Sequence, residues 1–467
     1  MLPPLSSRTF YHCSAIKGVF DVAIIGLGPS GLAAAARLGK SGLRVAVIES
    51  GKSVHRRNRY SPRDATRGHG GAGLFSDGKF SFFPSASELW SLPRESDLRA
   101  AYAWTCDILG AAGLDTPPFP TEPAAYSMGM GDWVLKDYPS DYLSLSARLK
   151  LVGDMVADVD GEIFDERQVD SITYDSPFDG FAVNTRHLDS ENTTPLLARR
   201  LILTTGRFGP LSKCLLDLTR HHSFRRLEVG YRIEQARDQA FFRDMKQLDP
   251  KFRFIELDGG VEWRTFCACR QGEAVLSETE GLWTVSGRSD CPPTGRSNSG
   301  FNTRILDESL ASRVIAPVLR AMANVDSHFE VSMAGLLGGD PETVAVFDKV
   351  YGPELRVIMT RGLSHLVRAF PCLGTDKNAR LIGPTFEGVG WYPNVDGDLR
   401  LSDVPAWVAG DACGLFRGIV AAMISGHYAA ASVLHELQPT LGVVSPQVGE
   451  GCGKEGGKTG AIRDNGS

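Results

Sequence analysis

The chain has 467 residues, of which 42% are hydrophobic and 22% are charged, and its formal net charge is −5. This length can bury the cores of two or three domains, and the slightly acidic balance gives no indication of a nucleic-acid partner. No apolar run reaches the roughly eighteen residues that a membrane-spanning helix needs. The nine cysteines include no CxxC pair and no zinc-like spacing. We therefore expect no nucleic-acid partner, no membrane span and no metal site.

Residues 1–20 contain Arg8 and Lys17 but no acidic residue. This composition is compatible with a short mitochondrial presequence, and a disordered leader is the alternative. The leader lacks the apolar core of a secretory signal, and scattered cysteines favour a reducing compartment. We expect a protein of the cytoplasm or the mitochondrial matrix that is not secreted.

Residues 22–38 predict a strand, a glycine turn and a helix. The apolar strand ends at Gly26, and an Ala-rich helical segment follows Gly31. Gly26 permits the tight turn, Gly28 lets a pyrophosphate approach the backbone, and Gly31 lets the helix pack closely on the strand. The phosphates would then meet the free N–H groups at the start of the helix.

A second apolar strand over residues 44–48 ends at Glu49. A carboxylate in this place can accept hydrogen bonds from a ribose. Because the strands, the turn, the helix and the acid agree, we predict dinucleotide binding rather than a glycine-rich turn in an ordinary α/β unit.

A glycine-dense loop follows at residues 67–80. Its backbone can lie flat against a planar ligand, and Ser76, Asp77 and Lys79 add polar groups to it. Further along, residues 87–112 and 142–156 predict helices.

Short alternating segments between residues 162 and 206 predict an antiparallel meander that returns to a buried strand. The region from residue 225 to about residue 382 mixes strands and helices without a second glycine fingerprint, which indicates a substrate domain. The dinucleotide domain then resumes, since residues 406–411 predict a short strand ending in an acid, and a helix of small residues runs from residue 417 to about residue 435.

Together these blocks resemble the two-domain flavoproteins that hold FAD on a single Rossmann unit of the glutathione-reductase type. More narrowly, the chain is similar to the family of FAD-dependent dehydrogenases. The blocks that carry this resemblance are GGAGLFSDGK at 70–79, TTGRFGP at 204–210, VGYRIE at 229–234, RTFCACRQGEAV at 264–275 and GDACGLFRGIVAAMISG at 410–426. The chain departs from the family pattern at Arg270-Gln271, where Pro-Gly usually follows the cysteine pair.

The resemblance implies FAD as the cofactor. The fingerprint would hold the ADP half, Gly410-Asp411 the ribityl and pyrophosphate groups, and the next helix N-terminus would face the flavin pyrimidine edge. Helix N–H groups there stabilise negative charge on the reduced flavin. The expected cofactor-binding residues are Gly26, Gly28, Pro29, Ser30, Gly31, Glu49, Gly71, Ser76, Asp77, Val169, Gly206, Gly410, Asp411, Arg417, Gly418 and Ile419.

The expected fold class is α/β, with a discontinuous Rossmann-type FAD-binding domain and an inserted α+β substrate domain. Its parts are a leader over residues 1–20, the first FAD-binding part over 21–224, the substrate domain over 225–394, the second FAD-binding part over 395–437, and a disordered tail over 438–467.

A general acid or base has to reach the substrate beside flavin N5. In the superfamily, a loop just before the returning strand often covers the flavin, and residues 383–393 hold this place. Glu387, Trp391 and Tyr392 are therefore candidates; the alternative is a structural crossover with the aromatic residues in the core. His427, on the helix after Arg417, is a further catalytic candidate, with packing as its alternative.

Cys267 and Cys269 lie two apart on a predicted strand, so we expect both on one face and no disulfide between them. They are either a redox or substrate-contacting pair, or small hydrophobic residues that fill the strand face. Arg232 and Arg264 could clamp a carboxylate or pair structurally. For His69, superfamily members with a histidine-linked FAD suggest covalent attachment, and a hydrogen bond to phosphate or water is the alternative.

We expect an FAD-dependent oxidoreductase that transfers a hydride between flavin N5 and a small organic substrate. The lack of a second GxGxxG argues against a tightly docked pyridine-nucleotide domain, so NAD(P)H would bind transiently if it is the reductant. One alternative is a monooxygenase that uses NAD(P)H and O2. Another is a non-catalytic binding protein, like the fold relatives that escort small GTPases. The sequence leaves the oligomeric state open.

Overall fold

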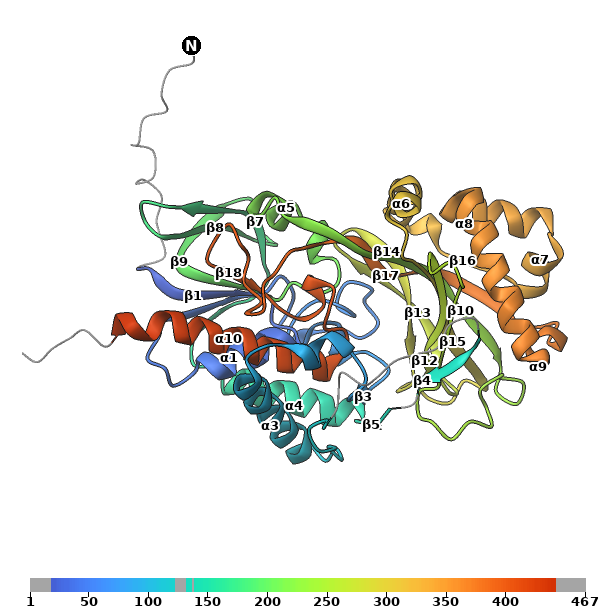
Figure 1. Cartoon of the computed structure of the whole chain (residues 1–467), viewed down its shortest axis with the longest axis horizontal. Coiled ribbons are helices and arrows are strands. Elements are labelled where there is room, and N and C mark those ends of the chain that lie inside the picture. The colour runs from blue at the N-terminus through green and yellow to red at the C-terminus, as the bar shows by residue number, and fades with distance from the viewer. Residues whose placement is uncertain (1–17, 122–131, 137, 442–467) are drawn as a thin grey trace, which may run out of the picture.

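The computed structural model describes residues 18–121, 132–136 and 138–441. The expected leader and tail therefore fall almost entirely outside the described residues. Within these residues, two seven-stranded sheets form the framework of the molecule (Figure 1). The two sheets lie side by side along the long axis, and each has its own hydrophobic core.

The first sheet contains the predicted dinucleotide unit. Its central strand β1 runs parallel to β2 and to β9, and β18 returns late in the chain to pair in parallel with β9. The predicted meander is confirmed, because β7, β8 and β9 pair in antiparallel fashion. The strands are β1 (Phe20–Ile25), β2 (Val45–Ile48), β6 (Glu162–Phe164), β7 (Arg167–Asp175), β8 (Gly180–His187), β9 (Thr193–Leu203) and β18 (Ala406–Val408).

Helices α1 and α10 pack closely together beside this sheet (Figure 1). A Cβ atom added to Gly426 of α10 would lie 2.0 Å from the carbonyl oxygen of Ser30 in α1, so only glycine fits at this crossing. The helices of this part are α1 (Pro29–Leu38), α2 (Gly71–Leu74), α3 (Glu95–Ala111), α4 (Leu145–Ala157), α5 (Lys213–Leu218) and α10 (Ile419–Leu441).

The second sheet is antiparallel, and a group of helices covers its outer face (Figure 1). Its strands, in spatial order, are β16 (Phe329–Ser332), β17 (Arg380–Pro393), β10 (His222–Ala236), β15 (Arg296–Ile305), β12 (Val261–Cys269), β11 (Lys251–Ile255) and β4 (Val134–Lys136). The helices are α6 (Glu308–Met322), α7 (Met333–Gly338), α8 (Pro341–Ala369) and α9 (Pro371–Thr375). Two further two-stranded sheets complete the described strands: the hairpin of β13 (Glu273–Thr279) and β14 (Leu282–Arg288), and the pair of β3 (Lys79–Ser81) with β5 (Ser140–Tyr142), which are distant in sequence.

The structure corrects several expectations. Residues 383–393 were expected as a loop over the flavin, but they belong to β17, which pairs with β10 and β16 inside the second sheet. The glycines of this segment accompany bulges in a continuous strand, with Gly390 at a φ of +93°. Pro93 separates a short turn at residues 87–91 from α3, so the segment 87–112 is not one helix.

The expected segment boundaries are also approximate. Strand β4 lies within the expected first FAD-binding segment but pairs with β11 in the second sheet. Strand β10 begins at His222, before the expected boundary at residue 225, and α10 continues to Leu441 beyond the expected end at residue 437. Across the described ranges, we find no helix with the length and apolar character needed to span a membrane.

Candidate functional site

A cavity of about 950 Å³ lies between the two sheets. One wall, which we call the dinucleotide wall, is formed by the segments that follow β1, β2, β9 and β18. The other wall is formed by side chains of β4, β11, β12 and β15. Open α/β sheets bind ligands beyond the carboxyl ends of their strands, and the first of these walls lies at the carboxyl ends of β1, β2, β9 and β18.

The glycine turn after β1 has two packing constraints and one open position. Gly26 has a φ of +101°, and a Cβ atom on Gly31 would lie 2.0 Å from the carbonyl oxygen of Gly26. Gly28 differs from both, since a Cβ atom there would have no neighbour closer than Gly71 Cα at 3.8 Å. Gly28 lines the cavity, so its missing side chain leaves room for a ligand rather than for the protein itself.

Glu49 braces this turn. Its carboxylate is buried and accepts hydrogen bonds from the backbone N–H groups of Leu27 at 2.7 Å, Gly51 at 2.7 Å and Gly68 at 3.1 Å. Ser50 Oγ also donates to Oε1, at 3.4 Å, whereas Oε2 accepts from Leu27 alone among the described residues, so Oε2 has room for a ribose hydroxyl. Glu49 thus has a structural role that the sequence did not reveal, and its contact with a ribose stays a prediction.

Arg57 holds the glycine-dense loop in place and was missed by the sequence analysis. Its buried guanidinium donates to the carbonyl oxygens of His69 at 2.6 Å and Gly71 at 2.9 Å. Burial lowers the pKa of Arg57 to about 10, against the opposing effect of Glu49 and Asp64, so the group stays charged at neutral pH. No motif marks such a residue, because its partners are backbone carbonyls.

His69 does not line the cavity. Its Nε2 atom lies 2.6 Å from Asp165 Oδ1, and its ring is buried. The hypothesis of a covalent flavin link at His69 therefore has no support from its position.

Asp411 marks the second half of the dinucleotide wall. Its Oδ2 atom pairs with Arg417 Nε at 3.2 Å and Arg207 Nε at 3.6 Å. Burial alone would raise the pKa of Asp411, but these two guanidinium groups hold it below its usual range. Its Oδ1 atom is buried without a hydrogen-bond partner among the described residues, as are the hydroxyl groups of Ser30 and Thr205. Buried polar atoms are normally satisfied, so these three indicate a polar ligand in the cavity.

The predicted cofactor-binding residues gather at this cavity. Gly31 is the exception, because it packs against the turn instead. Those that line it are Gly26, Gly28, Pro29, Ser30, Glu49, Gly71, Ser76, Asp77, Val169, Gly206, Gly410, Asp411, Arg417, Gly418 and Ile419.

Of the predicted catalytic residues, only Glu387 lines the cavity. Arg207 and Arg417 engage its two carboxylate oxygens, at 2.7 Å and 3.2 Å. Tyr392 is fully buried, and its hydroxyl accepts a hydrogen bond from the Val389 N–H at 3.0 Å. Neither Tyr392 nor its neighbour Trp391 is part of the lining, and the Trp391 indole donates to Glu308 instead.

His427 also lies outside the cavity lining. Its ring stacks on Trp104, with centroids 5.1 Å apart. Burial and the nearby Arg37 lower the pKa of His427 to about 4, so the imidazole is neutral. This arrangement corresponds to the packing alternative for His427.

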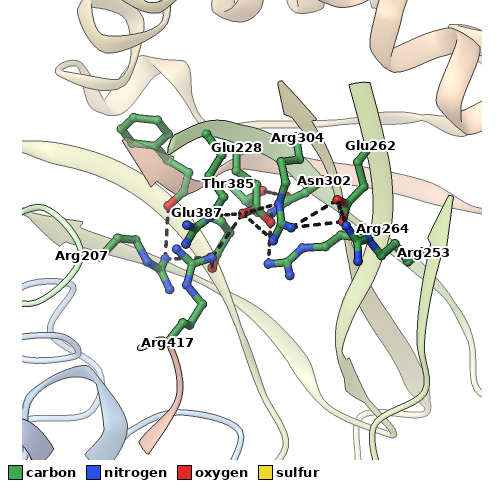
Figure 2. Close-up of polar contacts among 12 residues, drawn as sticks. Arg207, Glu228, Arg253, Glu262, Arg264, Asn302, Arg304, Thr385, Glu387 and Arg417 are labelled. Atoms are coloured by element: carbon green, nitrogen blue, oxygen red, sulfur yellow. Dashed lines mark hydrogen bonds and ion pairs between the residues drawn. The ribbon is translucent and has the colours of Figure 1, made fainter. Parts of the chain in front are cut away.

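Glu228 of β10 is the centre of a buried ionic network between the two walls. Figure 2 shows Arg264, Arg304 and Arg417 directed at its carboxylate, at 2.5, 3.4 and 3.5 Å, and Arg226 pairs with it at 3.4 Å. Burial alone would raise the pKa of Glu228, but the four guanidinium groups hold it well below its usual range. One fully buried carboxylate thus connects the dinucleotide wall to the second sheet.

The opposite wall carries a group of basic side chains that we call the cationic face. It consists of Lys136, Lys251, Arg253, Arg264 and Arg304, from four neighbouring strands. Within the described lining, the acids on this wall are Glu262 and Asp249. Burial, followed by the charges of Arg264, Lys251, Arg253 and Arg304, lowers the pKa of Lys136 to about 7. The cationic face therefore has an excess of positive charge that an anion would relieve.

Comparisons with known proteins agree with this picture. Residues 21–76, which contain the glycine turn, Glu49 and most of the glycine-dense loop, match the family of lycopene cyclase proteins, an FAD-binding family. No curated protein matches the chain. The fold and the site define an FAD-binding flavoprotein of the Rossmann type, and FAD fits the residues that line the dinucleotide wall.

Solved structures of low similarity also align with the chain. A flavoprotein/dehydrogenase from Cytophaga hutchinsonii is 15% identical, with 90% of this chain and 79% of that chain covered and a TM-score of 0.41. A geranylgeranyl bacteriochlorophyll reductase-like protein from Thermoplasma acidophilum is 13% identical, with 90% and 79% covered and a TM-score of 0.39. The anhydrotetracycline hydroxylase of Streptomyces rimosus is 14% identical, with 91% and 64% covered and a TM-score of 0.37.

The open position at Gly28 gives a first prediction. Gly28→Val should leave the fold intact, because no protein atom lies within 3.8 Å of the added Cβ, but its side chain would enter the dinucleotide wall. We expect the purified variant to retain little flavin, measured as flavin released per protein on denaturation. Gly153→Val, on α4 with no atom within 4 Å, is the control and should retain it. Full flavin content in Gly28→Val would show that the cofactor lies elsewhere.

The Glu228 network gives a second prediction. Glu228→Gln leaves four guanidinium groups without their shared anion, and breaking a buried ion pair in this way costs about 3–5 kcal/mol of unfolding free energy. Urea denaturation measures this loss. Glu354→Gln removes an exposed partner of Arg313 and should leave the midpoint nearly unchanged. If both variants unfolded at the wild-type midpoint, the network would contribute nothing to stability.

Proposed function

We propose that the protein is an FAD-dependent oxidoreductase that acts on a small organic anion. The observation that supports this most directly is that one cavity joins the dinucleotide wall to the cationic face. When bound, FAD supplies the hydride-accepting or hydride-donating centre. The remaining tasks, which are binding, orientation and the exclusion of water, fall to the residues of the chain.

The dinucleotide wall would hold the cofactor from both ends. The N–H groups at the start of α1 are placed for the pyrophosphate, and Glu49 for the ribose. The unsatisfied Asp411 Oδ1 is an acceptor for a ribityl hydroxyl. Gly418 and Ile419, at the start of the long helix α10, line the same cavity and favour negative charge there through the helix dipole.

The cationic face would bind the substrate. Glu228 and Glu262 fix Arg304, and Glu228 fixes Arg264, so these guanidinium groups are oriented before any ligand arrives. Preorganised, partly desolvated cations bind carboxylates and phosphates better than mobile surface ones do. A substrate with at least one carboxylate or phosphate group therefore suits this wall.

Glu387 is better suited to positioning than to proton transfer. Both of its oxygens already accept hydrogen bonds from guanidinium groups, and one of these belongs to Arg417 of the dinucleotide wall. We therefore assign Glu387 the orientation of Arg207 and Arg417. Catalytic roles for Tyr392 and His427 are not part of this proposal, because neither side chain lines the cavity.

The first experiment is the visible spectrum of the purified protein, followed by anaerobic titration with NADPH and NADH. We expect releasable FAD. Rapid bleaching by a nicotinamide nucleotide would indicate a reductase, or a monooxygenase if substrate is hydroxylated in oxygen. A flavin that ignores both nucleotides would indicate a dehydrogenase reduced by its own substrate. A colourless protein that takes up no FAD would overturn the proposal and favour the non-catalytic binding protein.

The cationic face gives a third prediction, on pH. Because the pKa of Lys136 is lowered to about 7, its charge is present below that pH and is lost as the pH rises through it. Bound anion favours the charged form, so binding should take up a proton. Oxalate keeps a constant charge between about pH 6 and pH 8. Over this range we expect its affinity for the FAD-loaded protein, measured by calorimetry, to fall about tenfold.

Variants separate Lys136 from its surroundings. Lys136→Met should bind oxalate more weakly at low pH and lose most of the pH dependence. Lys213→Met, at an exposed position on α5, is the control and should behave like the wild type. An affinity that does not change with pH in the wild type would argue against an anion site at this face.

A further inference from the structure

Cys267 and Cys269 do not have the geometry that their spacing predicts. In a regular strand, residues two apart lie about 6.6 Å from each other and their side chains stay separate. Here the pairing of β12 with β15 shifts between Phe266 and Cys269, and Cys267 has a φ of +48°. This bulge brings the two Sγ atoms to 3.7 Å, so the reason for excluding a bond between them does not hold.

The conformation of Cys267 is unusual for a residue with a side chain. Left-handed backbone at a non-glycine residue costs about 1 kcal/mol or more and is frequent at functional sites. A strand that only filled its face with small apolar groups would have no need of this bulge. The bulge is the feature that brings the two sulfurs together.

Cationic groups surround the pair. Arg232 is fully buried, and its Nη2 atom donates to the Cys267 carbonyl oxygen at 2.6 Å and to Cys269 Sγ at 3.6 Å. Lys79 donates to the carbonyl oxygen of Ala268 between them. The hydrogen bond from Cys267, with help from Arg232 and Lys79 against burial and Asp77, lowers the pKa of Cys269 to about 7. The same hydrogen bond, together with burial and Asp77, raises the pKa of Cys267 well above its usual range, against the effect of Arg232. Near neutral pH, Cys269 is therefore partly ionised and Cys267 carries its proton.

The two sulfurs differ in access. Cys267 is half-buried and lines the cavity, whereas Cys269 is fully buried behind it. A small molecule in the cavity can reach Cys267 first, and Cys269 only through it. This is the division between an attacking and a resolving cysteine.

We propose that Cys267 and Cys269 form a redox-active dithiol that exchanges with small disulfides entering the cavity. The Cys269 thiolate takes the proton of Cys267 while the Cys267 sulfur attacks one sulfur of the disulfide, breaks its S–S bond and releases one thiolate. Cys269 then loses its proton to that thiolate and attacks the Cys267 sulfur, which releases the second thiolate, protonated by solvent. The pair, which starts with one proton, loses two electrons and that proton; solvent supplies the second proton, and the disulfide becomes two thiols.

A metal ion is the competing occupant. Asp77 and the two sulfurs offer ligand atoms within 4.8 Å of one another. However, Lys79 lies 3.1 Å from Asp77, and Arg232 contacts Cys269, so two positive charges already face the would-be ligands. These charges favour a lone thiolate over a divalent cation.

The test uses the purified, FAD-loaded full chain with oxidised glutathione as the probe. After free thiols are blocked, trypsin cleavage at Arg264 and Arg270 places both cysteines on the peptide of residues 265–270. Mass spectrometry should show this peptide lacking two hydrogen atoms, with no blocking group. The exposed Cys372 is the internal control and should be blocked or glutathionylated, never lost in this way.

Single variants separate the two roles. Cys269→Ser should accumulate glutathione on Cys267, because no resolving thiol remains, and Cys267→Ser should leave Cys269 unmodified. The flavin content and unfolding midpoint of each variant report whether it folds. In the wild type, alkylation of this peptide should rise around neutral pH, well before that of Cys372.

Two results would overturn the proposal. One is a wild-type peptide that carries two blocked thiols after prolonged exposure to oxidised glutathione while Cys372 reacts. The other is stoichiometric zinc in the purified protein that is lost in Cys267→Ser, which would make the cluster a metal site. Neither result bears on the FAD proposal, so the two can fail separately.

Discussion

The structure depends on a single buried carboxylate. Glu228 lies on β10, fully enclosed, and receives guanidinium groups from its own strand, from β12 and β15, and from the segment before α10. None of these charges is acceptable in the interior alone, so each partner fixes the position of the others. The Glu228 ion pairs thereby fix the position of one cavity wall relative to the other. They also hold the arginine side chains that face the cavity in one orientation.

Local patterns in the sequence were sufficient for the dinucleotide half. The apolar strands, the glycine turn and Glu49 lie within thirty residues, and their geometry follows from neighbouring positions. The late block at Gly410 and Asp411 required a resemblance to a family, because β18 pairs with a strand two hundred residues earlier. Even so, sequence gave no sign of Arg57, whose partners are backbone oxygens.

The second half was harder to predict because its chemistry arises from tertiary structure. The cationic face draws Lys136, Lys251, Arg264 and Arg304 from separate strands, and only the sheet order brings them together. The place of residues 383–393 just before the returning strand suggested a loop, although antiparallel pairing on both sides makes them part of β17. A regular period of two placed the Cys267 and Cys269 sulfurs apart, and a bulge, which leaves no sequence signature here, reversed this.

The close crossing of α1 and α10 bears on the order in which the molecule can be assembled. Gly426 packs against Ser30, and Arg417 completes the environment of Glu228. Both Gly426 and Arg417 are separated from the glycine turn by nearly four hundred residues. During synthesis the first half of the nucleotide pocket emerges from the ribosome long before the second. Until Arg417 and α10 have been synthesised, a nascent chain therefore carries an unfinished pocket, and Glu228 lacks one of its four guanidinium partners.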